Sequence, residues 1–146
     1  MKNKGTPWLR AAMVFQLLTS AIHSLSFLRS RQGRNETEKQ LLDLMDNYKM
    51  DMGAGFHRSM GEIFTSVSFC FTMIFLLGGL LNLYMIRKQA SPDLLQGFVG
   101  IQALVFGAVF MMAVLFAFLP PITFSGIVFV LLVISYFRLG AELKKS

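Results

Sequence analysis

The sequence is poor in charge, in histidine and in cysteine. Only 15% of its 146 residues are charged, whereas an average globular domain has about 25%. Cys70 is the single cysteine, which excludes an intramolecular disulfide and a dithiol redox pair. A catalytic zinc site usually needs three protein ligands, and this chain offers two histidines, Glu62 and Cys70, with the cysteine at a different depth of the membrane, which makes a zinc site a weak hypothesis. We therefore expect no bound metal and no cofactor.

Several functional motifs are also missing. The chain contains no Walker loop, no dinucleotide-binding fingerprint and no hydrolase nucleophile elbow. Its net charge is +6, but most of the Lys and Arg residues flank apolar segments instead of forming one basic patch. This is the distribution of a membrane protein, so we expect no nucleic-acid partner.

The chain is rich in long apolar runs. Residues 94–137 include no charged residue and no histidine, and Pro120-Pro121 interrupt this run in its middle. At about 1.5 Å of rise per helical residue, the run is long enough for two crossings of a bilayer core of about 30 Å. The sequence therefore predicts an integral membrane protein.

Two earlier runs bring the predicted number of transmembrane helices to four. No segment shows the alternation of a barrel strand, so the spans must be helices. We expect an all-α, four-helix transmembrane bundle that forms one domain over residues 1–146, with the fourth span the shortest and the first an uncleaved helix. The expected spans are 8–28, 62–86, 95–119 and 122–138, with an extramembrane loop at 29–59.

The loop at 29–59 is predicted to contain one short amphipathic helix. Asn35 can cap this helix, and Glu38 follows at the spacing of a capping box. Apolar residues then recur at helical intervals between residues 41 and 52. Gly53 and Gly55 are expected to end the helix before the next span. We expect this helix to act as a lid on the bundle.

Polar side chains within the spans are the candidate functional residues. His23 and Gln16 lie on one face of the first span, and Glu62 begins the second. Ionisable groups at membrane depth are costly and are functional candidates by default. We consider a ligand-binding cluster of His23, His57 and Glu62. The alternative is structural: Glu62 pairs with Arg58, and His23 satisfies a neighbouring carbonyl.

The second span adds Thr65 and Ser68 as candidate ligand-binding residues. Hydroxyl side chains also hold membrane helices together by ordinary packing and hydrogen bonding, and this is the competing explanation. Gln102, in the third span, is expected to join the interior of the bundle. None of these residues is assigned a catalytic role from the sequence.

Basic residues also indicate the orientation. Eight Lys and Arg residues lie in the two terminal segments and the loop at 87–88, against six in the loop at 29–59. Because cytoplasmic segments carry the excess of positive charge, we expect both termini to be cytoplasmic.

Four short segments resemble a family of small, uncharacterised bacterial four-helix membrane proteins. They are Ala21-Ile22-His23-Ser24-Leu25, Met50-Asp51-Met52-Gly53, Gly78-Gly79-Leu80-Leu81-Asn82-Leu83 and Ile122-Thr123-Phe124-Ser125. Members of that family often have Gly-His-Thr where this chain has Ile22-His23-Ser24. The resemblance implies a location in the bacterial inner membrane, and it implies no activity.

Two classes of function are open from the sequence. The first is a binding or accessory module that holds a lipid, another hydrophobic small molecule, a second copy of the chain or another membrane protein. The second is a small intramembrane enzyme that acts on a lipid-soluble substrate with His23 as acid or base. We favour the first, because catalysis needs several polar groups that converge on one site.

Overall fold

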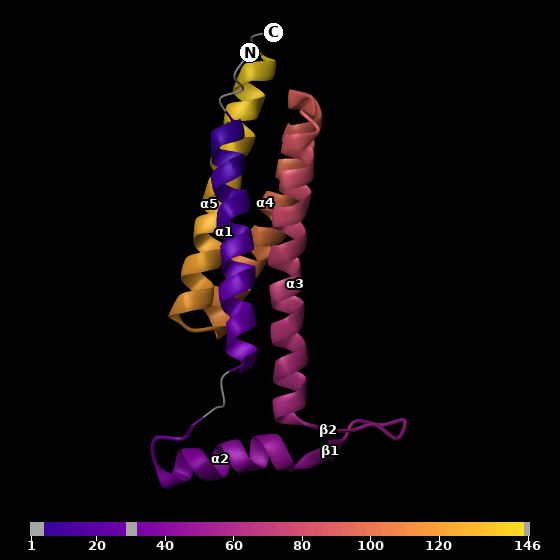
Figure 1. Cartoon of the computed structure of the whole chain (residues 1–146), viewed down its shortest axis with the longest axis vertical. Coiled ribbons are helices and arrows are strands. Elements are labelled where there is room, and N and C mark those ends of the chain that lie inside the picture. The colour runs from indigo at the N-terminus through magenta and orange to yellow at the C-terminus, as the bar shows by residue number, and fades with distance from the viewer. Residues whose placement is uncertain (1–4, 29–31, 145–146) are drawn as a thin grey trace. The chain divides into compact units, whose positions relative to one another are not determined.

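The structure is a computed structural model that describes residues 5–28 and 32–144 (Figure 1). Its described residues are helical except for turns and one short hairpin, which confirms the expected all-α fold. The elements in chain order are α1 (Thr6–Leu25), the 3-10 turn η1 (Ser26–Leu28), α2 (Glu36–Asn47), β1 (Lys49–Asp51), β2 (His57–Ser59), α3 (Met60–Arg87), α4 (Pro92–Phe116) and α5 (Leu119–Leu143).

Four of these helices are long and apolar enough to cross a membrane. They cover Thr6–Leu28, Met60–Arg87, Pro92–Phe116 and Leu119–Leu143, and each is 23 to 28 residues long. The expectation of four membrane-spanning helices is therefore confirmed, and the protein is an integral membrane protein by length and composition of its helices. Lys2, Lys4, Arg29, Arg31 and Lys145, which contribute to the charge count, lie outside the described residues.

The double proline does not separate the last two helices in the expected way. α4 ends at Phe116, before the expected boundary at 119, and α5 already begins at Leu119. Pro120 and Pro121 fall in the first turn of α5. Backbone N–H groups in a first helical turn have no partner within the helix, so proline is tolerated there. The expectation of a short fourth span is therefore wrong, because α5 has 25 residues.

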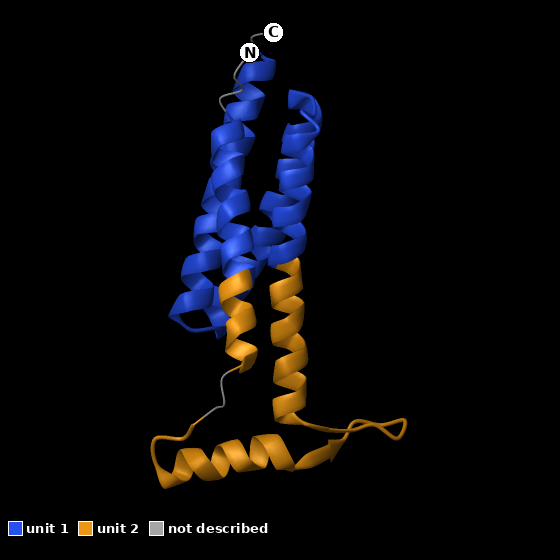
Figure 2. Ribbon diagram, viewed as in Figure 1, with its two compact units in different colours: residues 1–20, 75–146 blue, residues 21–74 orange. Residues whose placement is uncertain are grey.

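The chain divides into two compact units (Figure 2), while the expectation of a single domain stays a prediction. Unit 1 consists of residues 1–20 and 75–146. In its interior, the rings of Phe75 and Phe106 meet edge to face with centroids 5.0 Å apart. The Ser135 hydroxyl donates a hydrogen bond of 3.1 Å to the carbonyl of Gly5, which joins the start of α1 to α5.

Unit 2 comprises residues 21–74 and contains the end of α1, α2, the hairpin and the first half of α3. The cap of α2 is the expected one: Asn35 Oδ1 accepts a hydrogen bond of 2.8 Å from the backbone N–H of Glu38. The Glu38 carboxylate accepts a hydrogen bond of 2.6 Å from the backbone N–H of Arg34, the residue just before the cap.

A short hairpin, which was not expected from the sequence, precedes α3. β1 pairs with β2 in antiparallel register, with Lys49 opposite Ser59 and Asp51 opposite His57. Gly53 and Gly55 have φ angles of 83° and 81°, which glycine adopts without a steric penalty, and they form the turn of the hairpin. The helix they were expected to end stops earlier, at Asn47.

No residue of α2 is buried. Leu41, Leu44 and Tyr48 recur on one face and are 56%, 60% and 65% exposed. The structure therefore leaves the apolar face of α2 open within unit 2, and it gives no support to the expected lid.

Candidate functional site

His23 is paired with a hydroxyl group of the facing helix. Its Nδ1 lies 2.9 Å from Thr72 Oγ1, so the last turn of α1 is joined to the middle of α3 within unit 2. Thr72 is buried, whereas His23 is only half-buried. The Thr72 hydroxyl also lies 3.1 Å from the backbone carbonyl of Ser68, one helical turn earlier. The imidazole is thus fixed by one ring nitrogen.

Two phenylalanines flank the imidazole of His23. The Phe71 ring lies at 5.1 Å between centroids with a tilt of 49°, and the Phe27 ring lies at 5.9 Å in an edge-to-face arrangement. Phe27 is 39% exposed, and the centroid of its ring lies 6.5 Å from that of the Phe69 ring. The surroundings of His23 are therefore aromatic and apolar, with the Thr72 hydroxyl as its polar neighbour.

The second ring nitrogen of His23 has a different environment. Among the described residues, no group forms a hydrogen bond with Nε2. An imidazole nitrogen without a partner at membrane depth is unfavourable, because lipid tails offer no hydrogen-bonding group. Nε2 is therefore the atom of this region with unused capacity to bind a ligand.

Glu62 has a structural role at the start of α3. Its backbone N–H donates to the Ser59 hydroxyl at 3.2 Å, and its carboxylate accepts from the Ser59 backbone N–H at 2.9 Å. This reciprocal pair is a capping box, which satisfies two donors at a helix N-terminus. The carboxylate also lies 3.9 Å from the Arg58 guanidinium at the surface, as the structural alternative expected.

The structure does not bring His23, His57 and Glu62 together. His57 is an exposed residue of β2 opposite Asp51. Glu62 precedes Thr72, the partner of His23, by ten residues of the same helix, which corresponds to about 15 Å along its axis. Of the sequence-based candidates around this site, only Ser68 contributes, through its carbonyl.

Thr65 lies apart from His23 and serves its own helix. Its hydroxyl donates a hydrogen bond of 2.8 Å to the carbonyl of Gly61, four residues earlier. Such bonds are common for hydroxyl side chains in helices and need no ligand to explain them. Thr65 is exposed, so it also does not line a cavity in unit 2.

Gln16 belongs to a separate polar cluster inside unit 1. Its side-chain amide donates to Gln102 Oε1 at 3.1 Å and accepts from Asn82 Nδ2 at 2.8 Å. Gln102 Nε2 donates to Asn82 Oδ1 at 2.9 Å, which closes a ring of three amides from α1, α3 and α4. All three side chains are buried. We name this group the amide ring.

The amide ring is tightly enclosed. A Cβ atom added at Gly78 would lie only 2.6 Å from Gln16 Nε2 and 3.1 Å from the Phe106 ring. There is thus no space for a ligand on that side of Gln16. A fully connected polar network of this kind fixes how helices pack, so we assign Gln16 a structural role.

Gln16 and Gln102 were singled out from the sequence, but their connection to each other and to Asn82 was not predicted. Gln102 was expected in the interior, which its burial agrees with, and Asn82 lies on the polar face of its span. Side-chain amides are rare in these apolar spans, and this rarity was the signal that could have linked them. It could not reveal which amides meet, because that depends on how each helix is rotated.

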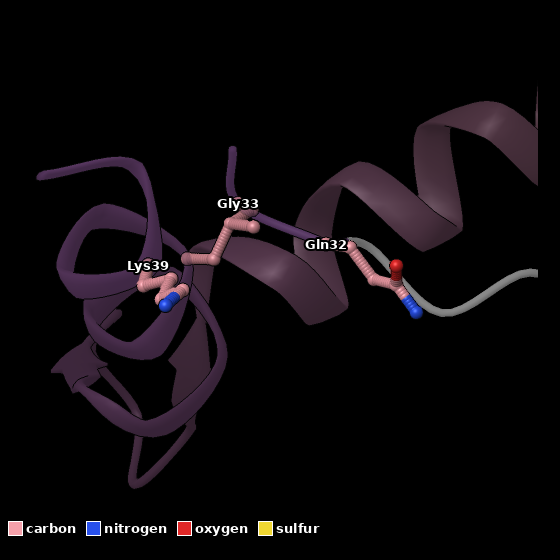
Figure 3. Close-up of a pocket in the computed structure, with 4 residues that line it drawn as sticks. Gln32, Gly33 and Lys39 are labelled. Carbon is pink, nitrogen blue, oxygen red and sulfur yellow. The ribbon is translucent and has the colours of Figure 1, made fainter. Parts of the chain in front are cut away.

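One hollow in unit 2 lies at the start of α2 and has a volume of about 390 Å³. Figure 3 shows Gln32 and Lys39 on either side of Gly33 at its rim, and Leu42 completes its lining. The Lys39 amine already pairs with Glu36 at 2.6 Å. The hollow is open to solvent and includes none of the candidate residues, so it is not part of the His23 site.

The described residues include no group of three or more His, Cys, Asp or Glu side chains placed to hold a metal ion. Cys70 lies alone on an exposed part of α3. The contacts described for His23 are the hydrogen bond with Thr72 and the aromatic contacts with Phe27 and Phe71.

Comparisons of the chain with protein-family models, with curated proteins and with solved structures find no match. The family resemblance seen in the short sequence segments stays a prediction, and the function is argued from the residues themselves.

Proposed function

We propose that this protein is a membrane-embedded binding module that holds a lipid-soluble molecule at His23. One observation supports the proposal most directly: His23 Nδ1 is fixed by Thr72 at 2.9 Å, while no described residue forms a hydrogen bond with Nε2. A ligand that pairs with Nε2 would remove the penalty of an unsatisfied polar atom in the bilayer.

The surroundings of His23 suit a ligand with an apolar body. Phe27 and Phe71 flank the imidazole, and both rings lie within 6 Å of it by centroid distance. Binding sites for small hydrophobic molecules combine such apolar walls with a small number of polar groups that fix orientation. His23 is the group that gives orientation in this proposal.

The alternative function, an intramembrane enzyme with His23 as acid or base, has less support. General acid–base catalysis needs a second polar group within hydrogen-bond reach of the reacting atoms. Thr72 uses its hydroxyl to fix the imidazole, and Glu62 caps α3 about 15 Å away along the helix. We therefore favour binding without chemistry.

We also propose where the protein resides. The family resemblance suggests a bacterial inner membrane, and the distribution of Lys and Arg favours cytoplasmic termini. α2 and the hairpin would then face the opposite side of the membrane. Bilayer lipid surrounds the spans in any case, and a second copy of the chain or another membrane protein would be a further partner.

Site-specific photo-crosslinking tests the proposal. Benzoylphenylalanine in place of Phe27 puts a reactive ketone beside His23, and the same residue in place of the exposed Phe118 serves as a control outside unit 2. We expect a defined small molecule to be captured at 27 and not at 118, and its capture to be lost in His23→Phe. Identical adducts of bulk phospholipid at both positions would contradict the proposal.

A further inference from the structure

The hydrogen bonds around Thr72 determine which nitrogen of His23 carries the proton. A threonine hydroxyl has one proton to donate and two lone pairs that accept. Thr72 Oγ1 donates its proton to the Ser68 carbonyl at 3.1 Å. When the hydroxyl keeps that bond, the imidazole donates the hydrogen bond of 2.9 Å to Thr72, which places the proton on Nδ1.

This assignment fixes the character of the other nitrogen. A charged imidazolium is costly in an apolar environment, so the ring inside the membrane-spanning segment is neutral. A neutral imidazole has one N–H and one bare nitrogen. With the proton on Nδ1, Nε2 has a lone pair and can only accept a hydrogen bond.

We propose that the ligand of His23 is a hydrogen-bond donor: a lipid-soluble alcohol or phenol whose hydroxyl group donates to Nε2. The inference deepens the proposed function and depends on it. A molecule that offers only acceptors, such as a quinone or an ester, cannot pair with Nε2, whereas the corresponding quinol or free alcohol can. His23 would thus bind the reduced quinol, which has a hydroxyl proton to donate, in preference to the oxidised quinone, which has none.

The aromatic neighbours narrow this class further. The planes of the Phe27 and Phe71 rings make angles of 80° and 49° with that of the imidazole, so the two rings contact it in different orientations. Planar aromatic rings pack favourably against such faces and edges. A phenol with an apolar tail can donate its hydroxyl proton to Nε2 of His23 and pack its ring against Phe27 and Phe71.

The position of the proton can be measured without any ligand. The full-length protein, in a His57→Gln background, has His23 as its single imidazole. Nitrogen-15 NMR of this protein in nanodiscs distinguishes the protonated from the bare ring nitrogen. We expect the proton on Nδ1. A proton on Nε2 would overturn the inference and leave the proposed binding function in place.

A matched pair of probes tests the ligand class. 4-Decylphenol and 4-decylanisole share ring and tail, but only the phenol has a hydroxyl group. We expect the phenol to bind the nanodisc-embedded protein about tenfold more tightly, as one hydrogen bond of about 1.4 kcal/mol requires. The preference should disappear in His23→Phe and persist in His57→Phe, which changes the same residue type outside the site.

The other outcomes are equally informative. Equal binding of both probes that is lost in His23→Phe would overturn the donor inference and retain the proposed function. Binding of neither probe, or binding unchanged in His23→Phe, would contradict both. Thr72→Val is a second variant for the case in which His23→Phe does not fold. It removes the hydroxyl that holds the proton on Nδ1 of His23. A folded Thr72→Val protein should therefore show a reduced preference for the phenol over the anisole.

Discussion

The Thr72 hydroxyl of α3 forms a hydrogen bond with the His23 imidazole. It is buried, and its loss would leave the N–H of the imidazole without a partner. Interhelical hydrogen bonds in membrane proteins contribute about 0.6 kcal/mol on average and up to about 1.7 kcal/mol. We expect Thr72→Val to lower the free energy of unfolding in bicelles by about 1 kcal/mol.

Thr65→Val is the control for this prediction. The same change at Thr65 removes a hydroxyl that bonds only to the carbonyl of its own helix, at Gly61, and Thr65 is exposed. We expect a change below about 0.5 kcal/mol, as for most surface substitutions. Equal losses at both positions would show that the His23–Thr72 bond has no special weight in stability.

Gly78 gives a second prediction for a single residue. A methyl group there would press on the amide of Gln16 and on the ring of Phe106. Overpacking of an interior costs about 1–3 kcal/mol, and we expect Gly78→Ala to destabilise the protein by this amount in steric-trapping measurements. Gly97→Ala should not destabilise it, because a Cβ at Gly97 meets no atom within 4 Å. Similar stability of both variants would argue against the enclosed amide ring.

As ligand-binding residues, the candidates named from the sequence stay predictions. The rarity of polar groups in apolar spans singled out His23 and Gln16, and both have interhelical hydrogen bonds. The partners could not be predicted. A helical face gives the direction of a side chain but not its height on the neighbouring helix, so the pairing of His23 with Thr72 was not predicted and Glu62 was preferred.

At the scale of the element, substitutions of Glu62 can distinguish a role in capping α3 from a role in binding a ligand. The capping box at the start of α3 uses its carboxylate as a hydrogen-bond acceptor, and a glutamine can do the same. We expect Glu62→Ala to lower the free energy of unfolding by about 0.5–2 kcal/mol and Glu62→Gln to have little effect. Neither change should alter ligand capture at His23. A loss of ligand capture in a stable Glu62→Gln protein would show that Glu62 takes part in ligand binding at His23.

The helices themselves were predictable because the bilayer restricts their length and polarity. A run of about 20 apolar residues has few alternatives to a spanning helix. Their ends were less predictable: α5 includes Pro120 and Pro121, since a first helical turn tolerates proline. The hairpin was missed because β1 and β2 have three residues each, too few to show an alternating pattern.

At the scale of the whole molecule, the proposed orientation can be tested with introduced cysteines. Cys70→Ser removes the single native thiol. In this background, Asn47→Cys labels the exposed end of α2, and Lys88→Cys labels the loop between α3 and α4. We expect a membrane-impermeant maleimide to react with Cys at 47 in intact cells and with Cys at 88 only after permeabilisation. The reverse pattern would place both termini outside the cytoplasm.

The most direct test of the central claim is native mass spectrometry of the protein released from membranes in mild detergent. Wild type, His23→Phe and His57→Phe are compared, and bound molecules are identified after extraction. We predict that wild type and His57→Phe retain one defined lipid-soluble compound with a hydroxyl group and that His23→Phe loses it. If all three proteins carry only the same bulk phospholipid, His23 does not hold a ligand and the proposed binding function is wrong.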